Sequence, residues 1–201
     1  LSKLGVKKGT IVAGFVPNCA ETVISMLAVS SLGGVWTSCS PDFGANGVVD
    51  RFGQVNPHIL ITSNGYSYNG KLFKLEEKVN GVLESIDSIQ HIVEIEYVDI
   101  KSNFNHDSII SFGDILNDEQ TQPKFEQLPF DHPLFIMYSS GTTGPPKSIV
   151  HSAGGTLIQH MKEHQLHCDI KAGKSTMFWF TTCGWMMWNW LVSGLSSGST
   201  I

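Results

Sequence analysis

The chain has 201 residues, 41% of them hydrophobic and 15% charged, which is enough length and apolar content to bury one sizeable core. Its 13 basic and 18 acidic residues give a net charge of −5 with no basic run, so nucleic acid and anionic membranes are poor partners. The four cysteines form neither CxxC pairs nor a dense disulfide scaffold, and this pattern favours reduced thiols in the cytosol.

The first half of the chain alternates apolar strands with amphipathic helices. Residues 10–16 form a β-branched run that predicts a buried strand, and Asn18 stands where the next helix needs an N-cap, with Glu21 three residues on. That helix ends at Gly33-Gly34. The later predicted elements are strand 35–38, helix 45–54, strand 59–62, helix 71–84 and strand 92–95. This alternation predicts an α/β fold, with a mainly parallel sheet flanked by helices.

The second half begins after a polar, irregular stretch over residues 96–130. We interpret that stretch as an acidic surface connection between a first subdomain, 1–130, and a second, 131–201. The second half predicts strands 133–138 and 148–151, helix 153–167, strand 177–181, helix 185–195 and the opening of a strand at 199–201. Residues 175–201 are uncharged and long enough for a membrane span, but their Thr, Asn, Ser and Gly content favours a strand, a turn and a buried helix.

A loop rich in hydroxyls and glycines joins the strands 133–138 and 148–151. It reads Ser-Ser-Gly-Thr-Thr-Gly-Pro-Pro-Lys and ends at Lys147. Glycines let backbone N–H groups approach an anion, hydroxyls add donors, and the lysine adds a compact positive charge. We therefore predict that the loop binds a polyphosphate. The predicted phosphate-binding residues are Ser139, Ser140, Gly141, Thr142, Thr143, Gly144 and Lys147.

Two other interpretations of this loop are open. An ordinary surface turn uses the same residue types, although seldom with four hydroxyls and a terminal lysine together. The nucleotide loop of P-loop ATPases is the second alternative, and it predicts a helix that begins at the lysine. Here Pro146 precedes Lys147, and the missing N–H of proline disfavours such a helix.

The loop resembles the phosphate-binding signature of the adenylate-forming superfamily, which includes the acyl-CoA synthetases. The segments Gly-Trp-Met-Met-Trp-Asn-Trp, 184–190, and His-Ser-Ala-Gly-Gly-Thr-Leu-Ile-Gln-His, 151–160, are similar to short-chain acyl-CoA synthetases, most closely to those that act on acetoacetate. The resemblance implies that the chain is an internal part of the large N-terminal, ATP-binding domain of such an enzyme. It also implies that residues 1–201 alone lack parts that catalysis needs.

The same resemblance implies a two-step ligase reaction on small molecules. ATP and acetoacetate would give an acyl-adenylate and pyrophosphate, and coenzyme A would then take the acyl group, leaving AMP and acetoacetyl-CoA. Mg²⁺ would screen the phosphates, and because the loop has no carboxylate, a protein ligand for that ion must lie elsewhere. A synthetase for acetate or another short carboxylate is one alternative. A catalytically silent ATP-binding module is another.

The resemblance also implies roles for individual residues. Lys147 would be catalytic. Trp185, Met186 and Met187 would line the acyl pocket, against the alternative that aromatic and Met residues at helical spacing belong to a core, to which we assign Trp188 and Trp190. The acetate enzymes carry an acidic residue where Thr182 stands.

Lys71 matches a position where related enzymes place an arginine near the phosphate on the adenosine of coenzyme A. Tyr68 stands where a second arginine would be. The other interpretation of Lys71 is an exposed lysine that opens a helix.

A histidine series in the helix predicted over 153–167 has the spacing of metal ligands. His160, His164 and His167 fall at i, i+4 and i+7, with Cys168 next to the last of them. Neither HExxH nor a second cysteine accompanies them, so we favour a partly buried helix face.

Overall fold

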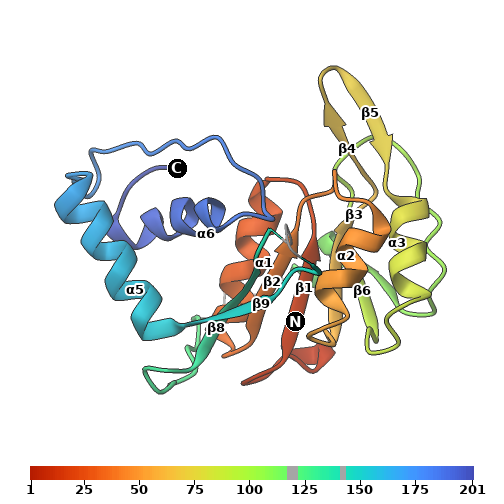
Figure 1. The fold of residues 1–201 in the computed structure, drawn as a ribbon, viewed down its shortest axis with the longest axis horizontal. Helices are drawn as coiled ribbons and strands as arrows, with labels where there is room; N and C mark the ends of the chain where they lie inside the picture. Colours follow the sequence, from red (N-terminus) through yellow and green to blue (C-terminus); the bar gives the residue numbers. More distant parts are fainter. Residues whose placement is uncertain (117–121, 141–143) are drawn as a thin grey trace.

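The computed structural model describes residues 1–116, 122–140 and 144–201. Its centre is a seven-stranded sheet in the order β7-β6-β3-β1-β2-β8-β9, and every pairing in it is parallel except that of β8 with β9 (Figure 1). The strands are β1 (Ile11–Phe15), β2 (Val35–Cys39), β3 (Ile59–Ser63), β6 (His91–Ile95), β7 (Ile109–Ser111), β8 (Pro133–Tyr138) and β9 (Ser148–Ser152).

Helices cover both faces of the sheet because the strands are apolar on both sides. Alternate residues of β3 enter different core clusters, with Ile59 and Ile61 in one and Leu60 in the other. The first cluster includes α1 (Ala20–Ser31), α4 (Phe112–Ile115) and α6 (Met186–Ser193), and the second includes α2 (Ala45–Phe52) and α3 (Glu76–Leu83). The predicted α/β fold with a mainly parallel, helix-flanked sheet is confirmed.

The helix predicted over 153–167 is present, with a change of pitch in its last turn. It comprises α5 (Ala153–Lys162) and a π-helical turn, η2 (Glu163–His167). Short 3₁₀ turns, η1 (Ser2–Leu4) and η3 (Gly194–Ser197), stand near the two ends of the chain. None of the helices in the part of the chain that the structure describes is long and apolar enough to cross a membrane.

The helix predicted over 71–84 is wrong in its first five residues. Residues 65–74 form a hairpin of β4 (Gly65–Tyr68) and β5 (Lys71–Lys74), and the helix begins only at Glu76. The turn residues Asn69 and Gly70 have φ angles of 49° and 72°. An Asn-Gly turn with both residues at positive φ fits the right-handed twist of a hairpin. Lys71 therefore opens a strand, not a helix.

The N-cap predicted at Asn18 is also wrong. The N-cap of α1 is Cys19, and its side chain makes no capping hydrogen bond. Thr22 Oγ1 instead donates to the carbonyl of Pro17 over 2.8 Å, while Asn18 Oδ1 accepts from Trp188 Nε1 over 2.8 Å. Asn18 thus joins α1 to α6 across the fold, which a local capping rule does not anticipate.

Three further predictions need correction. The stretch 96–130, predicted to be irregular, contains β7 and α4, and β7 extends the sheet next to β6. The strand predicted over 177–181 does not form, since only Thr176 and Thr200 share an isolated parallel bridge there. The strand expected at 199–201 is likewise reduced to that bridge. The division into two subdomains at residue 130 stays a prediction. Strand β8 of the second predicted subdomain pairs with β2 of the first in one sheet.

Candidate functional site

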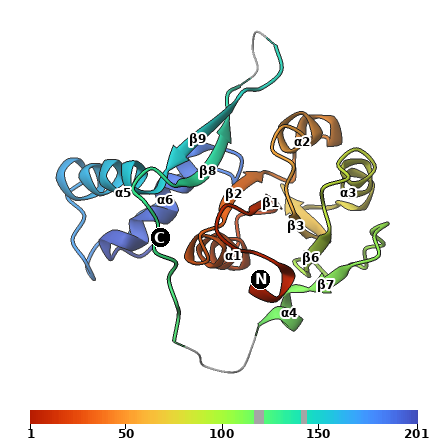
Figure 2. The same ribbon diagram turned by 90° about the horizontal axis from the view of Figure 1, so that it is seen from below.

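The predicted phosphate loop leaves the sheet at the carboxyl end of β8. In the parallel register Trp36 pairs with Phe135 and Thr37 with Ile136, so the end of β2 lies beside Tyr138 and Ser139. Figure 2 shows the β8–β9 hairpin reaching out from the sheet at this point. The carboxyl ends of parallel strands are the usual position of ligands in open α/β sheets. Lys147 leads into the strand β9, so the helix required by the P-loop interpretation does not form.

Two hydrogen bonds close the loop at a neck formed by Ser139 and Lys147. The Ser139 N–H donates to the Lys147 carbonyl over 3.0 Å, and the Lys147 N–H donates to Ser139 Oγ over 2.9 Å. Because Ser139 Oγ accepts here, its own O–H is still able to donate to a ligand. Ser140, Gly144 and the Lys147 side chain are exposed. Gly141, Thr142 and Thr143 lie outside the described residues.

The strand end before the neck is held by buried polar contacts. Thr37 Oγ1 lies 3.0 Å from the Tyr138 hydroxyl and donates over 2.9 Å to the carbonyl of Ile136. Burial raises the pKa of Tyr138, with the Thr37 hydrogen bond opposing it only in part, so the phenol stays protonated. The Arg51 guanidinium of α2 lies 4.8 Å from the centroid of the Phe43 ring and 5.9 Å from that of Tyr138.

The tryptophan segment is attached to the same edge of the sheet. Ser38 Oγ donates to the carbonyl of Cys183 over 2.7 Å, and Trp36 Nε1 donates to Ser38 Oγ over 3.1 Å. Gly184 follows, and a Cβ on it would lie 3.3 Å from the backbone nitrogen of Ser40. The chain therefore presses against the carboxyl end of β2, which brings Trp185 to the strand ends that also carry the neck.

The tryptophans of this segment differ in burial. Trp185 is 57% exposed and Met186 48%, whereas Trp188 is fully buried. Trp190 is half-buried, and its Nε1 donates to Glu163 Oε2 over 2.9 Å. Trp185 caps α6 from a β-region conformation, so its ring stands outside the core at the start of the helix. In the residues that the structure describes, Trp185 and Met186 are thus free to contact a ligand.

Lys71 is separated from the phosphate loop by topology. It lies on the two-stranded ribbon β4–β5, which projects from the body of the molecule (Figure 1), opposite Tyr68 in the register. Both side chains are exposed. The structure does not place Lys71 in the sheet that carries the neck.

The histidine series packs between helices and does not converge on one point. His160 is buried, with Nδ1 2.8 Å from Ser193 Oγ of α6, and the ring of His164 is 4.7 Å from that of Trp190. The π-helical turn shifts the register, so His167 and Cys168 are exposed. Burial, assisted by the nearby His164, lowers the pKa of His160 to about 4. The partly buried helix face is the better description.

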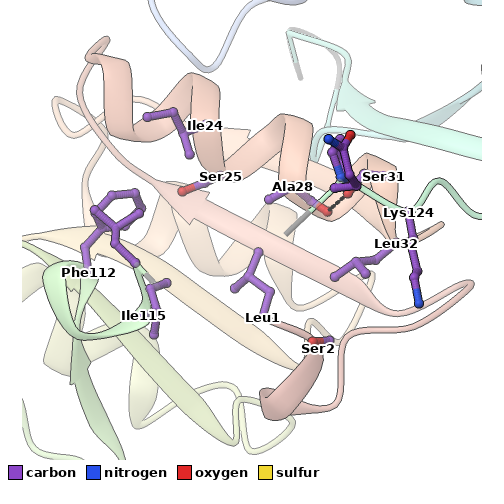
Figure 3. A pocket seen from close by; sticks show the side chains of 13 residues that line it. Leu1, Ser2, Ile24, Ser25, Ala28, Ser31, Leu32, Phe112, Ile115 and Lys124 are labelled. Carbon is purple, nitrogen blue, oxygen red and sulfur yellow. Dashed lines mark hydrogen bonds between the residues drawn. The ribbon is translucent and has the colours of Figure 1, made fainter. Parts of the chain in front are cut away.

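A separate hollow of about 520 Å³ runs along the outer face of α1 (Figure 3). Its walls are mainly apolar, from Leu1, Ile24, Leu32, Phe112 and Ile115. The hydroxyls of Ser25 and Ser31 in it already donate to backbone carbonyls of α1. None of the predicted site residues lines this hollow, and it offers no converging polar groups for chemistry.

Comparisons with known proteins show which family model and which relatives match the chain. The model of the family described as AMP-binding enzyme matches residues 1–201. Over 98% of its length the chain is 49% identical to acetoacetyl-coenzyme A synthetase of Rhizobium meliloti, and over its whole length 47% identical to acetoacetyl-CoA synthetase of Mus musculus. The structure of acetoacetyl-CoA synthetase from Streptomyces lividans superimposes with a TM-score of 0.94 at 45% identity, covering the whole chain. The chain spans 30% or 31% of the length of these three proteins.

Proposed function

Because the chain belongs to the family of AMP-binding enzymes, we propose that the protein is an acid–thiol ligase that activates acetoacetate with ATP and passes the acyl group to coenzyme A. The observation that supports this most is the neck closed by hydrogen bonds between Ser139 and Lys147, which lies at the carboxyl end of β8. The similarity to acetoacetyl-CoA synthetases favours acetoacetate among short carboxylates. The activity is proposed for the complete protein.

In the first step the loop would hold the β- and γ-phosphates of ATP. Lys147 would offset charge on the departing pyrophosphate, while the hydroxyls of Ser139 and Ser140 donate to phosphate oxygens. Gly144 and the three loop residues 141–143 belong to the same proposed cradle. The task is positioning and charge compensation, because the carboxylate and the α-phosphate repel each other until they are held in line.

Mg²⁺ would reach the site bound to ATP. Residues 139–148 hold no carboxylate, so within the loop the ion would be held through phosphate oxygens. When bound, it would neutralise part of the charge on the phosphates.

Trp185, Met186 and Met187 would form one wall of a short acyl pocket. Trp185 is exposed and follows Gly184, which lies against the end of β2, where a carboxylate would have to lie to reach a nucleotide held by the loop. A rigid indole limits pocket length, and thioethers fit an irregular surface. In this arrangement the size of the pocket selects acetoacetate over longer acids.

In the second step Lys71 would contact the phosphate on the adenosine of coenzyme A. Its exposed position on a projecting ribbon suits a large co-substrate that arrives after pyrophosphate has left. The four free cysteines are compatible with a reducing compartment, and we place the reaction in the cytosol.

Pyrophosphate exchange into ATP, driven by different carboxylates, tests the proposal. The complete protein should catalyse exchange with acetoacetate at a rate at least about tenfold above that with acetate or hexanoate. It should then form acetoacetyl-CoA when coenzyme A is added. Binding of ATP without exchange for any carboxylate would instead identify a silent nucleotide-binding module, and faster exchange with acetate would identify an acetate enzyme.

A further inference from the structure

The turn that follows helix α2 contributes a side chain that hydrogen-bonds to the phosphate loop. Gln54, just beyond the end of α2, reaches across the fold to the residues on both sides of Lys147. Its Nε2 donates to the carbonyl of Pro146 over 2.7 Å, and its Oε1 accepts from Ser148 Oγ over 2.8 Å. No local sequence pattern signals these contacts, since the partners are more than ninety residues apart in the chain.

The orientation of the Gln54 amide is set by its partners. Nε2 faces two carbonyl oxygens, that of Pro146 and that of Asp50 at 2.5 Å, and a carbonyl oxygen can only accept. Both amide hydrogens are therefore used, and the amide oxygen must turn to the hydroxyl of Ser148. The bond to Asp50, one turn back in α2, ties the side chain to its own helix and limits its rotamers.

These contacts fix one peptide group from two sides. The peptide between Pro146 and Lys147 has its C=O bound to Gln54 and its N–H bound to Ser139 Oγ. The next carbonyl, that of Lys147 itself, accepts from the Ser139 N–H. Rotation of this peptide would break bonds on opposite faces at once. The direction in which the Lys147 side chain leaves the backbone is thereby determined.

We propose that Gln54 is a positioning residue that orients the Pro146–Lys147 peptide and so aims Lys147 at the phosphates. This inference rests on the proposed function. Gln54 itself does not touch the nucleotide. It acts through the backbone of the loop, in the way that supporting hydrogen bonds hold a reacting group in its productive geometry.

Substitution of Gln54 by Met tests the proposal, because Met keeps the length of the side chain and removes its hydrogen bonds. In the complete protein Gln54→Met should lower kcat for acetoacetate-dependent ATP–pyrophosphate exchange about tenfold. The KM for acetoacetate should not change, because the hydrogen-bond partners of the Gln54 side chain, Asp50, Pro146 and Ser148, are not residues of the proposed acyl pocket. Gln90→Met is the matched control, since Gln90 is exposed at the amino end of β6 and makes no side-chain hydrogen bond among the described residues.

A second substitution separates positioning from a general effect on the fold. In a Lys147→Ala background, Gln54→Met should lower exchange less than about twofold, because the side chain to be aimed is gone. A tenfold loss in both backgrounds would overturn the inference, as would unchanged exchange by Gln54→Met in otherwise unsubstituted protein. Absence of exchange in the unsubstituted protein would overturn the proposed function, and this inference with it.

Discussion

Two hairpins of this molecule each present a lysine that we assign to a phosphate, and they are anchored differently. The β8–β9 hairpin belongs to the central sheet, and Lys147 is bonded to Ser139 through both its N–H and its C=O. The β4–β5 hairpin is a separate ribbon, and all four residues of β5, Lys71 included, are exposed. One lysine therefore leaves a fixed backbone, while the other stands on a projecting strand.

The difference matches two kinds of demand on a positive charge. A lysine that neutralises charge developing on a leaving group gains most from preorganisation. If that lysine is misplaced, stabilisation of the transition state is lost directly. A lysine that holds a distant phosphate of a co-substrate contributes to binding and tolerates movement. We therefore expect substitution of Lys147 to act on the rate of adenylation and substitution of Lys71 on the affinity for coenzyme A.

Lys147→Ala gives the largest expected effect. Removal of a charged contact to a transition-state anion costs about 2–4 kcal/mol, or roughly 10²–10³ in rate. Acetoacetate-dependent ATP–pyrophosphate exchange measures it. Lys8→Ala, which removes an exposed lysine before the amino end of β1, is the control and should be neutral. Unchanged exchange in Lys147→Ala would show that the β8–β9 hairpin is not part of the proposed site.

Trp185→Gly tests whether the acyl group binds at the same edge of the sheet as the β8–β9 hairpin. The variant should shift preference toward longer acids, because each added buried methylene is worth about 0.8 kcal/mol where room exists, so two methylenes give about tenfold. Exchange rates with acetoacetate and with six-carbon acids give the ratio. Equal loss with all acids, or unfolding of the variant, would show that Trp185 does not set the length of an acyl pocket.

Acidification should act on α5 and α6, which follow the anchored hairpin. The folded-state pKa of His160 is lowered from 6.5 to about 4 by burial, so the unfolded chain takes up this proton first as the pH falls. The stability that neutral His160 contributes is complete above pH 6.5 and is lost between pH 6.5 and 4, and about 1–2 kcal/mol of it is lost by pH 5.

Chemical denaturation of the complete protein at pH 7 and pH 5 measures that loss. The conservative variant His160→Gln should flatten the pH dependence. Denaturation midpoints that fall equally for both proteins would assign the loss to other groups.

Lys71→Ala gives the smallest expected effect. An exposed charge contact is worth about 0.5–1 kcal/mol, so the KM for coenzyme A should rise about two- to fivefold while ATP–pyrophosphate exchange stays the same. Lys101→Ala, at another exposed lysine, is the control. Slower ATP–pyrophosphate exchange in Lys71→Ala would contradict the assignment of the two lysines to different steps.

The sequence predicted the parts of the fold that depend on local apolar patterns. Strands β1, β2, β3, β6 and β8 and helices α1 and α2 lie where expected, because buried parallel strands and amphipathic helices have distinct periods. The neck of the loop lies at the carboxyl end of β8, where ligands of parallel sheets usually bind. The β4–β5 hairpin was missed although Asn69-Gly70 is a hairpin signal, because the Lys- and Glu-rich segment after it has the composition of a helix.

The remaining differences come from contacts between distant residues. Asn18 pairs with Trp188 instead of capping its own helix, and residues 177–181 have strand composition but no strand to pair with in the described chain. The hydrogen bond from Gln54 to Pro146 likewise forms only when α2 packs beside the loop. No window of sequence contains these pairs, so local rules could not predict them.

The central claim is that Lys147 acts on the β- and γ-phosphates, which leave as pyrophosphate. The reaction of acetoacetyl-adenylate with coenzyme A tests this claim most directly. This intermediate lacks the β- and γ-phosphates, so the Lys147→Ala protein supplied with it and with coenzyme A should form acetoacetyl-CoA within about twofold of the unsubstituted rate. The same variant started from ATP and acetoacetate should be roughly 10²–10³ slower. An equal slowing from both starting points would contradict the claim, because Lys147 would then act after the phosphates have gone.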